Sequence, residues 1–244
     1  MYSEEFCKAA TAMATRTGDY LLEFYRLDED NLQHVRTLSA LAEIFFNDDD
    51  LSVDPKFVLD MGCGTGEFLY QFLNIHPNYY GFGVNLFGSQ FLPDLPGNIR
   101  LVEGNIEDPS TWGSGQPQKF DTIFMNYVSG HVDVSKVFAV AQSLLKDDGV
   151  FIMWDLYPRV PYAKEIAGYA LRTPWEMRLN AIMTGFKTFD FRLWPNCMHN
   201  VCISPGVQRC LPQEDIDTFK RLTAPVLYLM TNKDGHDRQS PTGY

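Results

Sequence analysis

Three glycines at alternate positions follow a short apolar run and form the part of the chain best suited to bind a ligand. They lie in the sequence FVLDMGCGTGEF, residues 57–68. A glycine turn lets backbone N–H groups approach a ligand, because no side chain blocks them and positive φ angles are accessible. The helix predicted to follow presents its free N–H groups to the same ligand. We interpret the turn as a nucleotide-like cofactor site; the alternative is an ordinary strand-to-helix turn.

The spacing of the glycines distinguishes two kinds of nucleotide site. The dinucleotide fingerprint G-x-G-x-x-G requires a glycine at position 67, where Glu67 stands. The pattern G-x-G-x-G, preceded by an acid, resembles motif I of the class I S-adenosylmethionine (SAM) methyltransferases. This resemblance implies that SAM is the cofactor and S-adenosylhomocysteine (SAH) its product. It assigns cofactor contacts to Asp60, Gly62, Cys63, Gly64 and Gly66.

Strand-like and helix-like segments alternate across residues 57–155, which is typical of a doubly wound parallel sheet. Apolar runs typical of strands begin at 57, 79, 99, 120 and 149, and a helix is expected over about 133–145 with 146–149 as its stop and turn. Residues 223–231 have the pattern of a last strand, which in the family inserts antiparallel. The expected fold class is a Rossmann-like, seven-stranded α/β sheet.

Further segments flank the predicted SAM-binding core of residues 51–155. Residues 1–50 have helical spacing and are expected to form an N-terminal helical cap. Residues 156–222, rich in proline and aromatic residues, are expected to form a substrate lid. Residues 223–233 would return as the last strand of the core, and the polar residues 234–244 would form a disordered tail.

Polar residues follow or end five of the predicted strands. They are Asp60, Asn85, Asn105, Asn126 and Asp155. Ligands of parallel sheets bind where the carboxyl ends of the strands meet, so these side chains are expected to converge on one site. Asn85 stands where the family usually has an acid, and an amide holds a hydroxyl group without the assistance of a charge.

Two further segments extend the resemblance to the cofactor site. Residues 83–90, GVNLFGSQ, resemble a run of the cyclopropane-synthase-like branch, which implies that Asn85 and Gln90 hold the ribose, with Leu86 in the same site. For Gln90 the alternative is a solvated helix residue. Residues 104–108 match the segment that holds adenine, which implies Asn105 at the amino group and Ile106 on the ring.

Two residues beyond the fourth strand are candidates for catalysis. Asn126 ends that strand, where family members commonly hold the methionine part of SAM. His131 can accept a proton near neutral pH and is the candidate base, although a histidine that merely packs there fits equally well. Tyr127 is placed to orient an acceptor. SAM carries its own activation, so the protein must chiefly align the acceptor and exclude water.

A narrower resemblance concerns residues 126–133, NYVSGHVD, and 174–178, PWEMR. They resemble segments of the terpene-type C-methyltransferases that act on geranyl diphosphate, although Tyr127 replaces the glutamate of that family. The resemblance implies a prenyl or lipid-like acceptor, aromatic groups around a carbocation, and arginines for a diphosphate, with Mg²⁺ for such a substrate. The candidate acceptor residues are Tyr157, Arg159, Tyr162, Trp175 and Arg178, and further aromatic candidates are Tyr169, Phe186, Phe189 and Phe191. The alternatives are a hydrophobic lid core for the aromatic residues and a solvated face for the arginines.

Composition limits the possible partners. The net charge of -11 argues against binding to duplex nucleic acid. No apolar run approaches the ~18 residues of a membrane span, and the N-terminus lacks a signal-peptide pattern, so a cytoplasmic location is expected. The five irregularly spaced cysteines favour free thiols in a reducing compartment. The sequence C-x-H-x-x-C at 197–202 lacks the paired C-x-x-C of structural zinc sites, so no metal site is assigned.

The leading hypothesis is a SAM-dependent methyltransferase acting on a small molecule, with an oligomer compatible with the sequence. The alternatives are a SAM-binding scaffold or cyclase of the same fold that transfers no methyl group, and an O- or N-methyltransferase of a small metabolite. An enzyme that methylates nucleic acid or protein is disfavoured by the acidic charge. The Asn/Asp-Pro-Pro-Tyr motif is also missing after the fourth strand, where Asn-Tyr-Val-Ser stands.

Overall fold

The structure is a computed structural model that describes residues 55–88, 91–92, 94–160, 163–166, 169–193, 213, 217 and 221–233. Several sequence-based predictions lie outside these residues. They are the helical cap of residues 1–50, the tail of 234–244, the Cys/His segment 197–202, and the individual residues Gln90 and Tyr162.

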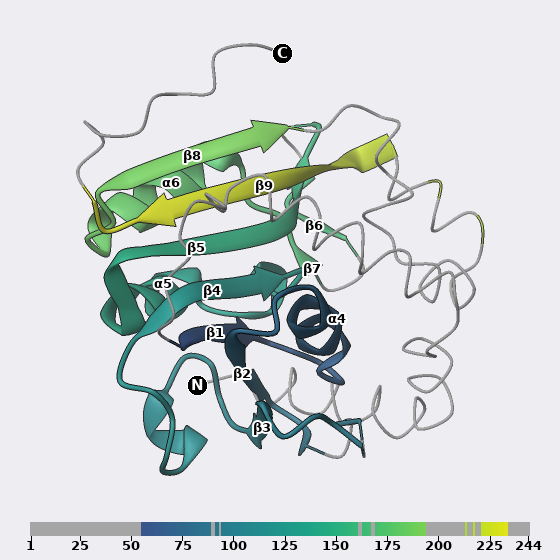
Figure 1. The fold of residues 1–244 in the computed structure, drawn as a ribbon. Helices are drawn as coiled ribbons and strands as arrows, with labels where there is room; N and C mark the ends of the chain where they lie inside the picture. The colour runs from purple at the N-terminus through teal and green to yellow at the C-terminus, as the bar shows by residue number, and fades with distance from the viewer. Residues whose placement is uncertain are drawn as a thin grey trace.

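A seven-stranded sheet organises the described chain, with the strand order β3-β2-β1-β4-β5-β9-β8 (Figure 1). The strands are β1 (Lys56–Met61), β2 (Tyr79–Asn85), β3 (Ile99–Glu103), β4 (Phe120–Asn126), β5 (Leu145–Pro158), β8 (Thr188–Leu193) and β9 (Thr223–Thr231). The first five strands are parallel, and β9 runs antiparallel between β5 and β8. The predicted Rossmann-like fold and the antiparallel last strand are confirmed. The strand order reverses between β1 and β4, which is where such sheets bind ligands.

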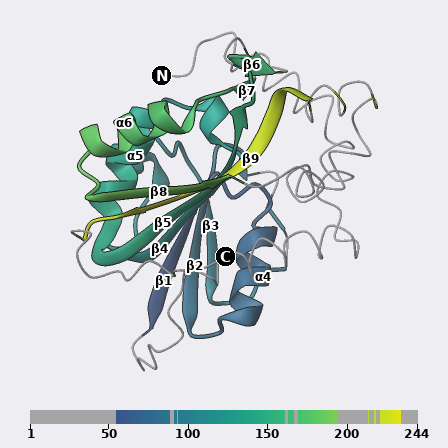
Figure 2. The same cartoon turned by 90° about the horizontal axis from the view of Figure 1, so that it is seen from above.

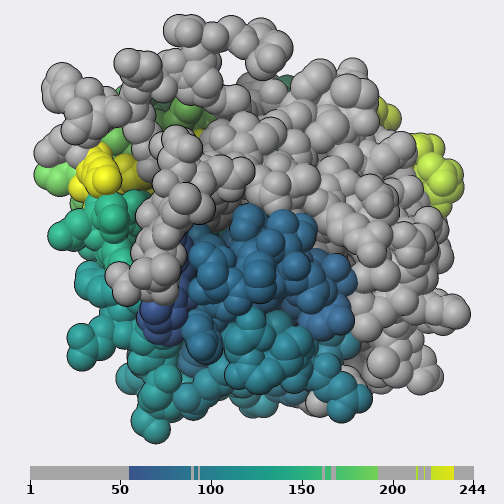
Figure 3. Space-filling view, in the orientation of Figure 1, coloured from purple at the N-terminus to yellow at the C-terminus, as the bar shows by residue number. Residues whose placement is uncertain are grey.

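Helices cover both faces of the sheet (Figure 2). The helix α4 (Glu67–Ile75) lies on one face, whereas α5 (Val134–Leu144) and α6 (Pro174–Met183) lie together on the other. A glycine in β2 allows the close approach of α4, because a Cβ at Gly81 would lie 3.2 Å from Leu73 and 3.4 Å from Leu69 of that helix. In the space-filling view of Figure 3, the blue residues around α4 and the segments that follow them in the chain form one continuous area of the surface.

Side chains of β4 point alternately into the two apolar clusters that lie on either face of the sheet. Ile123 and Met125 face the cluster beneath α5, whereas Phe124 between them faces the cluster beneath α4. Successive side chains of a strand point to opposite faces, so a strand covered on both sides is apolar throughout. Phe124 meets Phe68 and Phe72 of α4 edge-on, with ring centroids 4.8 and 5.2 Å apart.

β5 begins earlier than its sequence suggested. It starts at Leu145, directly after α5, rather than at Gly149. Its register to β4 passes from Phe120↔Leu145 to Thr122↔Val150, so the residues predicted to form a turn are an irregularity within the strand. The ion pair between Lys146 Nζ and Asp121 Oδ1, 2.8 Å long, fastens this irregularity to β4.

Part of the predicted lid belongs to the main fold. Residues 188–193 form the edge strand β8, and α6 packs against α5 beneath the sheet. Phe186 is 4% exposed and stacks with Phe151 in the core at a centroid distance of 5.9 Å. It is therefore a core residue, which agrees with the alternative of a hydrophobic core, because the chain between α6 and β8 closes one layer of the core. The remaining described part of this region includes a short hairpin of β6 (Glu165–Ile166) and β7 (Tyr169–Ala170).

Candidate cofactor and acceptor site

The glycine turn after β1 has a backbone that only glycine adopts easily. Gly62, Gly64 and Gly66 have φ angles of 82°, 55° and 88°. A Cβ at Gly62 would lie 2.5 Å from Cγ2 of Val128, and one at Gly66 would lie 2.5 Å from Cδ1 of Leu101. Conformation therefore favours glycine at all three positions, and the lack of space requires it at Gly62 and Gly66.

The same turn is fastened to β2 and opens onto α4. The backbone N–H groups of Gly62 and Cys63 donate to the carbonyl oxygen of Val84, at 2.8 and 3.0 Å. The helix α4 begins at Glu67, and no side-chain hydrogen bond caps its N-terminus. The N-terminal end of a helix is a common place for a ligand to accept backbone hydrogen bonds.

Asp60 is a buried carboxylate at the edge of this turn. It is 2% exposed, and burial raises its pKa to about 7. Within the described chain its Oδ1 atom has no hydrogen-bond partner. Buried polar atoms are nearly always satisfied, so an unpartnered carboxylate oxygen beside a glycine cradle fits a site for a ligand with an ammonium or hydroxyl group.

Asn126 extends this polar set onto the neighbouring strand. Asp60 pairs with Phe124 of β4, so Asn126 lies two residues further along at the same edge of the sheet. Neither polar atom of its side-chain amide has a partner among the residues that the structure describes. Cys63 differs, because burial and then the nearby Asp60 raise the pKa of its thiol, so it is an inert, small residue of the turn.

The loops after β2 and β3 carry the predicted ribose and adenine residues. Asn85 Nδ2 donates to the carbonyl oxygen of Phe87 at 3.2 Å, and Leu86 between them is half-buried. Asn105 Oδ1 accepts the backbone N–H of Glu107 at 2.9 Å. Ile106 is 4% exposed and packs in the core cluster, so its role beside a ring remains a prediction.

The segment after β4 brings Tyr127 and His131 to the same edge of the sheet. Tyr127 has a φ of 56° and is the one described residue other than glycine with a positive φ. Its N–H donates to the carbonyl oxygen of Trp154 at 2.9 Å. His131 is exposed, but its neighbours partly desolvate it, and this lowers the pKa of the imidazole. A bulky residue with positive φ is strained, and such strain clusters at functional sites.

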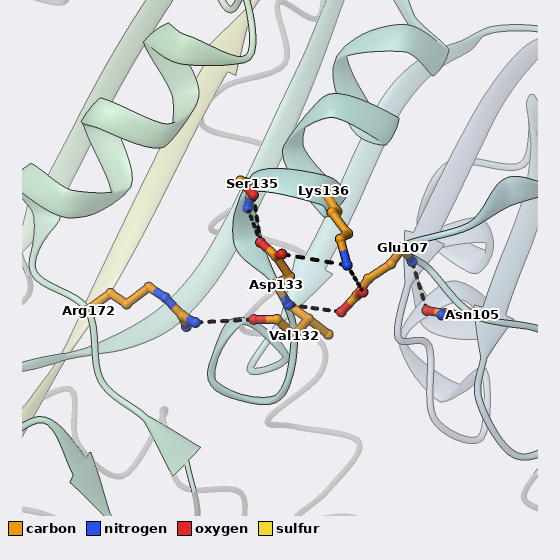
Figure 4. A network of polar contacts seen from close by, with 7 residues as sticks. All are labelled: Asn105, Glu107, Val132, Asp133, Ser135, Lys136 and Arg172. Carbon is orange, nitrogen blue, oxygen red and sulfur yellow. Dashed lines mark hydrogen bonds and ion pairs between the residues drawn. The ribbon is translucent and has the colours of Figure 1, made fainter. Parts of the chain in front are cut away.

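Three residues support this segment in a way that the sequence analysis did not predict. Tyr169 donates to Asp155 Oδ1 at 2.5 Å, and its ring meets that of His131 edge-on at 4.9 Å. Arg172 donates to the carbonyl oxygens of Ser129 and Val132, and Figure 4 shows the second of these bonds. Asp155 was recognisable as a strand-end acid. Arg172 is one of the arginines that the resemblance offered for a diphosphate, but its contacts with the turn could not be predicted, because its partners lie about forty residues away.

The predicted acceptor residues that the structure describes are dispersed. Tyr157 is half-buried in β5 and packs against the core. The backbone N–H of Arg159 donates to the carbonyl oxygen of Leu222. Trp175, 69% exposed, and Arg178 lie on α6 with solvent-exposed side chains. No group of three or more metal-ligating residues, and no helix able to cross a membrane, is found within the described ranges.

Comparison with known proteins shows the family to which the chain belongs. A family model described as a methyltransferase domain matches residues 30–196. No functionally curated protein matches the chain. Geranyl diphosphate C-methyltransferase from Streptomyces coelicolor A3(2), in complex with Mg²⁺, geranyl diphosphate and SAH, is 15% identical with a TM-score of 0.58, covering 81% of this chain and 80% of that one.

Two other solved structures show how widely this fold is used. The [4+2]-cyclase SpnF has a TM-score of 0.64 at 12% identity and covers 82% of this chain and 81% of its own. Phosphoethanolamine N-methyltransferase 2 from Haemonchus contortus, in complex with SAM, has a TM-score of 0.60 at 13% identity and covers 81% of this chain and 53% of its own. At such identities the likeness concerns the fold and not the acceptor.

Proposed function

Because this chain belongs to the methyltransferase domain family and has the class I fold, we propose that it transfers a methyl group from SAM to a small prenyl or lipid-like acceptor. The observation that carries this proposal is the glycine cradle at 62–66 beside the buried Asp60, whose Oδ1 has no hydrogen-bond partner among the described residues. The remaining cofactor residues are Cys63, Asn85, Leu86, Gln90, Asn105, Ile106 and Asn126.

Asp60 and Asn126 would hold the polar methionine part of the cofactor. Their unpartnered oxygen and nitrogen atoms are suited to an ammonium and a carboxylate group at the junction of β1 and β4. The carboxylate of Asp60 would gain a cationic partner there, which offsets the cost of its burial. When bound, SAM supplies a methyl group that is already activated on a sulfonium.

We call residues 127–133 the acceptor turn, because they follow β4 at the edge where the acceptor would lie. Tyr127 would orient the acceptor. His131 would take up a proton where the acceptor loses one, and its lowered pKa keeps the imidazole neutral and ready to accept. The rest of the rate enhancement would come from alignment of the acceptor with the methyl group and from exclusion of water.

A prenyl diphosphate is the preferred acceptor class. The resemblance of residues 126–133 and 174–178 to terpene C-methyltransferases supports it, as does the fold shared with the geranyl diphosphate enzyme. The resemblance, and not their placement in the fold, supports Tyr157, Tyr162 and Trp175 as contacts of the hydrocarbon. It likewise supports Arg159 and Arg178 as contacts of the diphosphate, with Mg²⁺ as its counterion.

Two measurements test the proposal. Calorimetric titration with SAH is expected to show binding, and its absence in the micromolar range would remove the enzyme assignment. Transfer of labelled methyl from SAM is then measured with geranyl diphosphate, with and without Mg²⁺, against phosphoethanolamine as a matched phosphorylated acceptor without a prenyl chain. Labelling of phosphoethanolamine alone would contradict the prenyl class.

A second candidate function is binding of SAM without methyl transfer, as a scaffold or cyclase. The observation that favours it is Tyr127, which replaces a glutamate of the terpene C-methyltransferases with a residue that holds no negative charge at neutral pH. This alternative predicts SAH binding together with no label in any acceptor, including a whole metabolite extract.

A further inference from the structure

The acceptor turn is held from two sides by side chains that are far away in the sequence. Arg172 donates to the carbonyl oxygen of Ser129 at 2.5 Å and to that of Val132 at 3.1 Å. On the other side, Glu107 Oε1 accepts the backbone N–H of Asp133 at 2.9 Å. Figure 4 shows Arg172 and Glu107 approaching the turn from opposite directions.

We propose that Arg172 and Glu107 are positioning residues that hold the acceptor turn in the conformation that presents Tyr127 and His131. The inference rests on the proposed function, because the turn acquires this task only if an acceptor faces it. In the structure the Arg172 guanidinium donates to two backbone carbonyl oxygens of the turn, and the Glu107 carboxylate accepts a backbone N–H. Both act through the backbone of the turn.

The turn cannot fix its own shape. Its only regular element is η3 (Ser129–His131), a single 3₁₀ turn, and such short turns have weak hydrogen-bond geometry. The N–H of His131 donates to the carbonyl oxygen of Val128 at 2.9 Å, whereas the N–H of Val132 reaches that of Ser129 only at 3.5 Å. Tyr127, with its φ of 56°, adds a strained residue that persists only where the surroundings determine it.

The ring of Tyr169 fills the inner side of the turn. Arg172 and Glu107, which we call the clamp, therefore hold the turn against a packed side chain. The ring of Tyr169 lies so close to Gly130 that a Cβ there would meet it at 2.4 Å. The same ring contacts His131, and its hydroxyl is anchored on the buried Asp155. Once Arg172 and Glu107 fix the backbone, the His131 ring has one favourable place against Tyr169.

Glu107 also joins the turn to the cofactor side. Its N–H donates to Asn105 Oδ1, a candidate adenine contact, while its carboxylate holds the N–H of Asp133. The carboxylate further pairs with Lys136 at 3.5 Å, and its side chain is only 6% exposed. Glu107 therefore contacts both Asn105, where the ligand would be held, and the backbone of the acceptor turn.

Conservative substitutions of Arg172 and Glu107 can separate the loss of a hydrogen bond from the loss of a side chain. A guanidinium carries several donors in a rigid fork, so it reaches two carbonyl oxygens at once, whereas a lysine ammonium is a flexible point charge. Arg172→Lys therefore keeps the charge and loses the double contact. Glu107→Gln keeps an oxygen that accepts the N–H of Asp133, whereas Glu107→Ala removes it.

Amide hydrogen exchange of the full chain, followed by NMR without ligands, tests the clamp. We expect Arg172→Lys and Glu107→Ala to speed exchange at His131 and Val132 by about tenfold, the effect of losing one hydrogen bond in local opening. Glu107→Gln should stay within about threefold of wild type. The ring signals of His131, shifted by Tyr169, should move in the first two variants while those of His76 stay in place.

Arg100→Lys is the matched control, because Arg100 also donates to a backbone carbonyl, that of Ser114 at 2.7 Å, away from the turn. Unchanged exchange and unchanged His131 signals in both Arg172→Lys and Glu107→Ala would overturn the inference. Equal acceleration in α5 would overturn it as well, since it indicates global destabilisation. Calorimetry with SAH is run in parallel. Failure of wild type to bind would remove the proposed function, whereas normal binding with an unchanged turn would remove only the clamp.

Discussion

The hydroxyl of Tyr169 donates a 2.5 Å hydrogen bond to Oδ1 of Asp155, and the two side chains are only 9% and 1% exposed. The bond joins the β6–β7 hairpin to the end of β5, directly behind the acceptor turn. Burial raises the pKa of Asp155, and the Tyr169 bond opposes this rise. The pair therefore stabilises a carboxylate in an environment that disfavours charge.

Tyr169→Phe removes this donor and keeps the ring, so the buried Oδ1 of Asp155 loses its hydroxyl partner and retains the backbone N–H of Leu156, 2.7 Å away. We expect the free energy of unfolding at neutral pH to fall by about 1–3 kcal/mol. Urea denaturation measures this change. Tyr80→Phe is the control, because Tyr80 is 50% exposed and its hydroxyl remains in water. A loss no larger than that of the control would show that the bond contributes nothing to stability.

Asp60 gives the protein a specific dependence of stability on pH. Its pKa rises from 3.8 to about 7 on folding, so between these values the native state keeps a proton that the unfolded chain releases. The free energy of unfolding of the ligand-free protein should therefore fall as pH rises from about 4 to about 7. Asp60→Asn should flatten this slope and raise stability at pH 7 by about 1–3 kcal/mol. Thermal unfolding across this range measures both effects.

The exposed Asp94→Asn is the control for Asp60, since it removes a carboxylate that stays in water. It should leave the pH slope as in wild type. A wild-type slope retained in Asp60→Asn would mean that another buried acid carries the effect.

Gly64→Val tests the cofactor cradle. Gly64 has a φ of 55°, which a β-branched residue adopts only with strain, so the substitution should distort the turn. We expect affinity for SAH to fall by at least about tenfold, equivalent to the loss of one good contact, with the fold retained. Gly97→Val is the control, because Gly97 has no atom within 4 Å of an added Cβ. Unchanged SAH affinity in Gly64→Val would move the cofactor site away from this turn.

Local sequence patterns predicted most strands of the sheet. They did not predict the side chains that hold the acceptor turn in place. β1, β2 and β4 follow from apolar runs that end in polar residues, and the glycine turn follows from its spacing. β8 alternates as Thr-Phe-Asp-Phe-Arg-Leu, but the prolines around it favoured a lid, and only its pairing with β9 makes it part of the sheet. The sequence could not indicate the clamp, because its contacts join residues 26 to 43 positions apart.

His131→Ala tests the proposed base. We expect turnover, with whichever acceptor is labelled, to fall by about 10²–10⁴-fold, the usual contribution of proton transfer, while SAH affinity changes little. Desolvation lowers the pKa of His131 below 6.5, so the wild-type rate should rise with pH through a value below 6.5 and be level at neutral pH. Stopped assays over this range measure the profile, and His76→Ala serves as the control. A variant that loses SAH affinity and keeps its turnover would make His131 a structural residue that supports the site, and an unchanged pH profile would identify another group as the proton acceptor.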